Sequence, residues 1–162
     1  TDVQIVFLSP GDAKAAFSSG AIDAWVTWGS YVALATLHDD ATVLADGDGR
    51  LSGYGYEAAS EAAIAGKRPQ MEDFLRRLAK ARRWAGEHPQ EFAAALSKET
   101  GLQPDVALYT VQHYRIAPSA IDDAAVAEGR AVLDRFRAAG AVTSTRDPAG
   151  AFDRSFNAAV AP

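Results

Sequence analysis

Short apolar runs alternate with helix-forming segments over the first fifty residues. Residues 3–8, VQIVFL, are uncharged and rich in β-branched side chains, which predicts a buried strand. Residues 21–28, AIDAWVTW, and residues 41–47, ATVLADG, are also mainly apolar, and each contains one aspartate, Asp23 and Asp46. The segments between them, 9–20 and 30–39, carry helix signals. The order strand, helix, strand, helix, strand predicts an α/β fold in which helices cover a parallel sheet.

The helix signals lie at the boundaries of these segments. Ser9 is a good N-cap, Pro10 suits a first helical turn, and Gly20 can end that helix. Ser30 is expected to cap the second helix. Turn residues at 46–49 end the third predicted strand. Three strands leave sheet edges open, so this sheet requires partner strands.

The pattern becomes helical after about residue 60. Prolines stand at or near the expected helix starts, where a missing N–H costs little, and Gly101 and Gly140 fall where helices should stop. The expected helices cover residues 69–87, 89–99, 104–113 and 122–139, with a shorter one near 148–157.

Composition and charge limit the classes of protein to which this chain could belong. The 162 residues, 48% hydrophobic and 23% charged, fit one globular domain or two small halves. The net charge is −5, and the basic run FLRRLAKARRW at residues 74–84 has helical spacing, so it is interpreted as a solvated helix face and no nucleic-acid partner is expected. No apolar run approaches the roughly 20 residues of a membrane span. The chain begins Thr1-Asp2-Val3, without Met, and is expected to be a mature or truncated product.

The side chains that perform catalysis or bind metals are sparse. The chain has no cysteine, which excludes disulfides, thiolate zinc sites and cysteine nucleophiles. His38, His88 and His113 lack metal-ligand spacing, and no GxSxG, P-loop or GxGxxG motif occurs. The glycine-rich stretch at residues 45–53 lacks the spacing of an EF-hand. We therefore expect no enzyme, no cofactor and no metal.

Several stretches resemble one family when they are taken in order. They are VQIVFLSPGDAKAAFSSGAIDAWVTWGSY at 3–31, TVLADGDG at 42–49, RWAGEHPQEFAAALSKETGL at 83–102 and APSAIDDAAVAEGRAVLDRFRAAGAV at 117–142. Together they resemble the aliphatic-sulfonate and taurine-binding proteins of ABC importers, relatives of nitrate and thiamine-precursor binders. The most specific piece is DAKAAFSSGAIDAWVTW, residues 12–28.

The resemblance implies a fold. It predicts a periplasmic binding protein of type II-like architecture, a parallel sheet segment plus a helix-rich return to the other lobe. Residues 1–52 would belong to the second lobe, 53–60 to a hinge crossing and 61–162 to the C-terminal part of the first lobe. Family members are longer, so the chain is expected to hold an incomplete two-lobed fold.

The resemblance also implies a function. The chain would be the solute-binding component of an ABC transporter, holding a small organic anion, expected to be an aliphatic sulfonate, between two lobes and delivering it to a membrane permease. It would work in the periplasm or another extracytoplasmic space, and a lipid anchor on the full-length protein stays open. Two alternatives use the same two-lobed plan: an enzyme, which the lack of cysteine disfavours, and the effector domain of a transcription regulator.

The candidate ligand-binding residues begin with Trp28, Gly29, Ser30 and Tyr31. Ligands of open parallel sheets bind beyond the carboxyl ends of strands, and Trp28 ends the second predicted strand. Period-two alternation puts Trp25 on the opposite face, under a helix. A sulfonate offers only acceptor oxygens and a negative charge, so a helix N-terminus suits it. Where the family often has Asp-Pro, this chain has Gly29-Ser30, which removes a repelling carboxylate.

Three further candidates complete the set. Ser9 opens the first helix at the same expected edge of the sheet, and Tyr54 and Tyr56 flank Gly55 in the presumed hinge. Helix capping by the serines and ordinary packing of the tyrosines are the structural alternatives. Arg115 begins a loop that could reach an anion, although a surface role is more usual for arginine.

Overall fold

A computed structural model of the chain describes residues 2–47, 53–114 and 117–161. The chain divides into two compact units: unit 1 holds Thr1–Ala45 and His88–Arg115, and unit 2 holds Asp46–Glu87 and Ile116–Pro162. The turn residues 48 and 49 and the candidate Arg115 lie outside the described residues. The division into 1–52, 53–60 and 61–162 stays a prediction.

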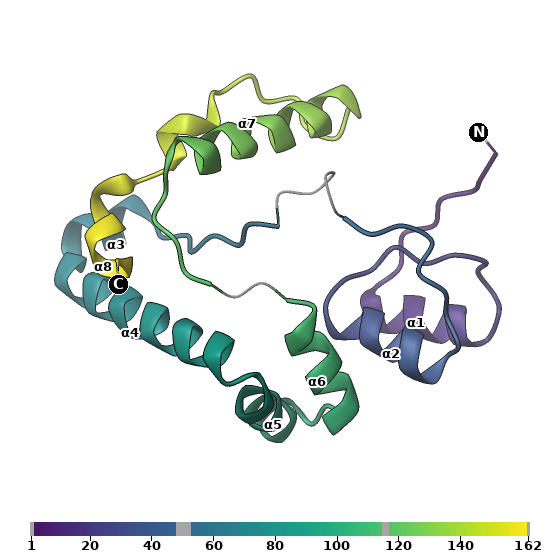
Figure 1. Ribbon diagram of the computed structural model, residues 1–162. Helices are drawn as coiled ribbons and strands as arrows, with labels where there is room; N and C mark the ends of the chain where they lie inside the picture. Colours follow the sequence, from purple (N-terminus) through teal and green to yellow (C-terminus); the bar gives the residue numbers. More distant parts are fainter. Residues whose placement is uncertain (1, 48–52, 115–116, 162) are drawn as a thin grey trace. The chain divides into compact units, whose positions relative to one another are not determined.

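Unit 1 is built on two pairs of helices that also contact one another. The first pair is α1 (Pro10–Ser18) and α2 (Ser30–His38), and the second is α5 (Pro89–Thr100) and α6 (Pro104–Gln112). Helix α6 packs against both α5 and α2, and α1 lies beside α2 (Figure 1). The small core between α5 and α6 is lined by Ala93, Ala107 and Val111, with Phe92, Leu96, Leu102 and Leu108 around it.

The two helix starts of unit 1 differ in how their N–H groups are satisfied. The hydroxyl of Ser9 accepts a hydrogen bond from the backbone N–H of Asp12 at 3.3 Å, so Ser9 caps α1 as expected. Helix α2 begins at Ser30, but the cap position belongs to Gly29, and no side chain caps the helix. The prediction that Ser30 is the N-cap was wrong by one residue.

Unit 2 arranges short elements around one long helix. Helix α3 (Glu61–Gly66) leads into α4 (Arg68–Glu87), and α4 packs against α8 (Asn157–Val160). Helix α7 (Asp123–Ala138) packs against the 3₁₀ turn η1 (Pro148–Ala151). Where one short helix was expected near 148–157, the chain instead makes η1, then a second 3₁₀ turn, η2 (Arg154–Phe156), and α8.

Glycine and arginine make two close contacts in unit 2. The ring of Phe152 lies so near Gly129 of α7 that a Cβ there would meet its Cζ at 2.6 Å. The guanidinium of Arg68 stacks 4.4 Å from the centroid of buried Phe156 and donates to the carbonyl of Ser155 at 3.0 Å. Both contacts hold the C-terminal turns against the long helices.

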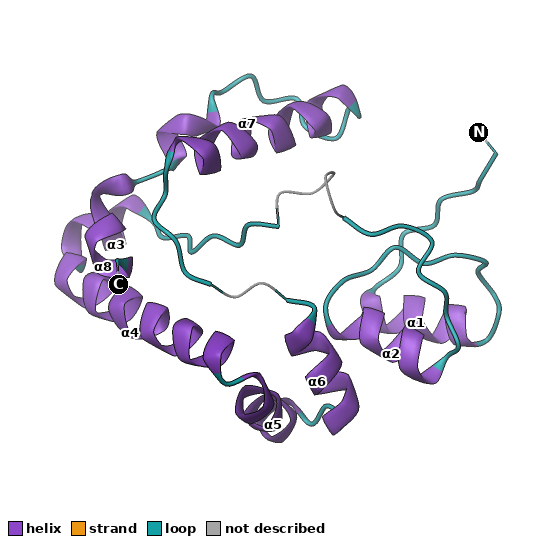
Figure 2. Ribbon diagram, viewed as in Figure 1, coloured by secondary structure: helices purple, strands orange, loops and turns teal. Residues whose placement is uncertain are grey.

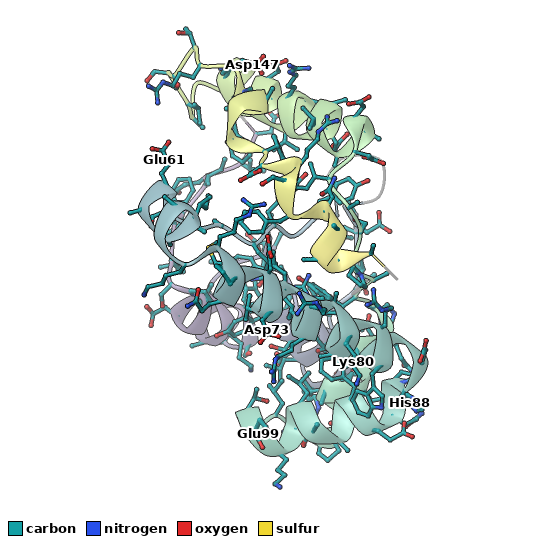
Figure 3. All side chains as sticks on the ribbon, turned by 90° about the vertical axis from the view of Figure 1, so that its left-hand side faces the viewer. Glu61, Asp73, Lys80, His88, Glu99 and Asp147 are labelled. Atoms are coloured by element: carbon teal, nitrogen blue, oxygen red, sulfur yellow. The ribbon has the colours of Figure 1, made fainter. Side chains whose placement is uncertain are left out.

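The basic run at residues 74–84 lies on α4, as its spacing indicates. Arg76 and Arg77 pair with the carboxylate of Asp73 at 3.2 and 2.8 Å, and Lys80 is exposed. Asp73 and Lys80 are marked on this helix in Figure 3. The run is therefore a solvated helix face, as interpreted from the sequence. Among the described residues, no helix is both long enough and apolar enough to cross a membrane.

The expectation of an α/β fold with a parallel sheet was wrong. Within the described residues there is no strand, and residues 3–8, 24–28 and 41–45 run without a sheet ladder (Figure 2). Their apolar side chains are exposed, with Phe7 at 94%, Val26 at 96% and Leu44 at 86%. A parallel sheet is stable when helices bury both of its faces and neighbours pair its edges. The two short helices α1 and α2 cannot bury both faces of a three-stranded sheet, and they supply no strand to pair with its edges. The type II-like sheet segment therefore does not form.

Candidate functional site

The N-terminus of α2 is the centre of the predicted site. Gly29 has φ +59° and ψ −136°, a conformation open to glycine and strained for other residues. Its carbonyl accepts from the N–H of Val32 at 3.1 Å, and no side chain caps the turn. The first turn of α2 carries no acidic residue. The first N–H groups of a helix lack partners within it, so this end offers donors and a partial positive charge.

The two tryptophans before this turn have different surroundings. Trp25 is half-buried, with its ring 6.1 Å from that of Phe17 on α1 and 5.6 Å from that of Tyr31 on α2, measured between centroids. Trp28 is 69% exposed. The prediction that Trp25 packs under a helix is confirmed by its contact with Phe17. The indole of Trp28 lies at the surface beside the start of α2.

The ring of Tyr31 contacts another aromatic ring, whereas the hydroxyl of Thr27 has no hydrogen-bond partner among the described residues. The edge contact with Trp25 holds the Tyr31 ring at the first turn of α2. Within the described part of the chain, the buried hydroxyl oxygen of Thr27 has no hydrogen-bond partner. Buried polar groups are normally satisfied, so this hydroxyl beside Trp28 is a further candidate donor. No pattern in the residue order points to Thr27, because a threonine in an apolar run is ordinary.

Ser9 is in the same unit but at another helix start. Its hydroxyl donates to the carboxylate of Asp12 at 2.7 Å and accepts from the Asp12 N–H. The carboxylate places a negative charge at the N-terminus of α1, which disfavours an anion there. Ligand contact by Ser9 stays a prediction, and α2 is the better of the two starts for an anion.

Tyr54 and Tyr56 belong to unit 2. Their ring centroids are 6.1 Å apart, and the Tyr56 ring lies edge-on to Phe152 at 5.4 Å. The Tyr56 hydroxyl donates to the carbonyl of Ala125 at 3.3 Å, and partial burial raises its pKa above the usual value. These contacts fix Tyr56 against α7. Both rings are nearly half exposed, and their contact with a ligand stays a prediction.

His38 and His113 each contact a polar group of the protein. The Nε2 atom of His38 lies 3.0 Å from a carboxylate oxygen of Asp105, which links α2 to α6. The Nδ1 atom of His113 lies 2.8 Å from the carbonyl of Tyr109 one turn earlier. In the part of the chain that the structure describes, no three His, Cys, Asp or Glu side chains gather as metal ligands would.

A separate surface hollow of about 520 Å³ lies on α5 and α6, and it contains none of the predicted site residues. It is lined by Gln90, Ala93, Ala94, Ser97, Lys98, Pro104, Asp105 and Leu108.

Comparison with known proteins gives two short matches. Over 47 residues, 29% of this chain, the sequence is 47% identical to the "Putative aliphatic sulfonates-binding protein" of Escherichia coli (strain K12). It is 40% identical over 47 residues to a protein of the same name from Bacillus subtilis (strain 168). The matched segment spans only 15% and 14% of these two relatives. No family model matches the chain. No solved structure matches it either. The chain is thus similar, over one segment, to proteins named for binding rather than catalysis.

Proposed function

We propose that the chain is part of the solute-binding component of an ABC importer, acting outside the cytoplasm. Its ligand would be a small organic anion, an aliphatic sulfonate, which it would deliver to a membrane permease. The observation that carries this proposal is the 47-residue similarity to two proteins named for binding aliphatic sulfonates.

The start of α2 is the proposed seat of the sulfonate group. A sulfonate is ionised at every physiological pH and only accepts hydrogen bonds. Free N–H groups and the positive end of the helix dipole therefore suit it, and the absence of an acid in the first turn avoids repulsion. The exposed indole of Trp28 would cover the alkyl part.

Ligand-dependent thermal stability tests the proposal. We expect alkyl sulfonates to raise the melting temperature of the purified chain, and of the longer gene product if one exists, as RT ln(1 + [L]/Kd) requires. Nitrate, a pyrimidine and an alkylammonium salt at equal ionic strength serve as comparison ligands. Stabilisation by the alkylammonium salt but not by any sulfonate would contradict an anion site.

The charge at position 29 gives a matched pair of variants. Gly29→Asp and Gly29→Asn introduce side chains of the same size into the same strained backbone, and only the aspartate adds a negative charge beside the N–H groups. We expect the affinity for the sulfonate to fall about tenfold more in the Gly29→Asp variant than in the Gly29→Asn variant. The reason is that one like-charge contact near a surface costs about 1–2 kcal/mol. Calorimetric titration measures the difference. Equal affinities would place the anion elsewhere.

A further inference from the structure

We draw no further inference here: the strongest candidate, the surface hollow on α5 and α6 that Lys98 and Asp105 line, carries none, because the Asp105 carboxylate already pairs with His38 and nothing in the structure shows what covers the rest of the hollow.

Discussion

At the scale of single residues, Trp25 and Trp28 are the sharpest contrast in the chain. Trp25 has ring partners on two helices, whereas Trp28 is 69% exposed. We expect Trp25→Ala to lower the free energy of unfolding by about 2–3 kcal/mol, somewhat less than a fully buried tryptophan would cost. Trp28→Ala should change it by less than about 0.5 kcal/mol, as surface substitutions do.

Urea unfolding measures the stability of both variants, and sulfonate titration separates their roles. Trp28→Ala should weaken binding of long-chain sulfonates more than that of methanesulfonate, because the lost contact is to the alkyl part. Equal destabilisation by the two variants would mean that Trp28 is packed in solution.

Asp147 gives a pH-dependent test of unit 2. Two hydrogen bonds from the Arg130 guanidinium, at 3.0 and 2.9 Å, lower the pKa of this carboxyl to about 2, and the N–H of Ala149 helps. The pKa is lower in the folded protein than in the unfolded chain. The carboxylate therefore stabilises the fold fully above about pH 4, and this stabilisation is lost as the pH falls toward 2.

Carbon-detected NMR titration of Asp147, which is labelled in Figure 3, should give a midpoint well below the usual aspartate range. Asp147→Asn should reduce the loss of unfolding free energy between pH 4 and 2. A midpoint near 4 in the folded protein would show that the Arg130 contact does not persist in solution.

At the scale of elements, Arg68 ties the start of α4 to the C-terminal turns. Its guanidinium donates to both the carbonyl and the hydroxyl of Ser155 and stacks on Phe156. A lysine keeps the charge but has neither the planar fork nor the stacking face. We expect Arg68→Lys to cost about 1 kcal/mol of unfolding free energy, measured in urea. Arg76→Lys, in a surface pair on the same helix, is the control and should cost less than about 0.5 kcal/mol.

Helices were the part of the fold that the sequence predicted well. Proline at the first turn located α5 and α6, and the left-handed Gly101 ends α5 as its position indicated. Helix α3 was missed, because six residues between Ser60 and Lys67 are too short to show a period. The prediction of one helix after Pro148 was wrong. Asp147 and Asp153 each accept a hydrogen bond from the N–H two residues further on and so cap two separate turns. The spacing of residues does not show this local competition between side chain and helix.

The candidate site was predictable only in part, for a similar reason. Trp25 contacts Phe17 and Trp28 is exposed, but the alternation used to separate them belongs to a strand, and residues 24–28 form none in the described structure. The cap position of Gly29 and the unpartnered hydroxyl of Thr27 depend on the φ of one glycine and on what surrounds one oxygen, and neither leaves a pattern in the residue order.

At the scale of the whole molecule, the three apolar runs show why the fold class was wrong. Such a run indicates that its side chains favour burial and an extended backbone. Whether a sheet forms depends on how much apolar surface and how many strand partners the chain can supply. The buried apolar residues described are mostly alanines, with Val106, Val111, Val126 and Phe156 the larger ones. Burying alanine returns little free energy, so these small cores stabilise helix pairs without enforcing a sheet.

This difference between helices and extended runs predicts a pattern of amide exchange. The amides of residues 3–8 and 24–28 should exchange at rates close to those of an unfolded chain, because their N–H groups have no acceptors in the described chain. Amides in α5 and α6, which enclose the Ala93 and Ala107 core, should exchange slowest in unit 1. Strong protection of residues 3–8 would contradict this picture, because it would mean that their N–H groups are hydrogen-bonded in solution.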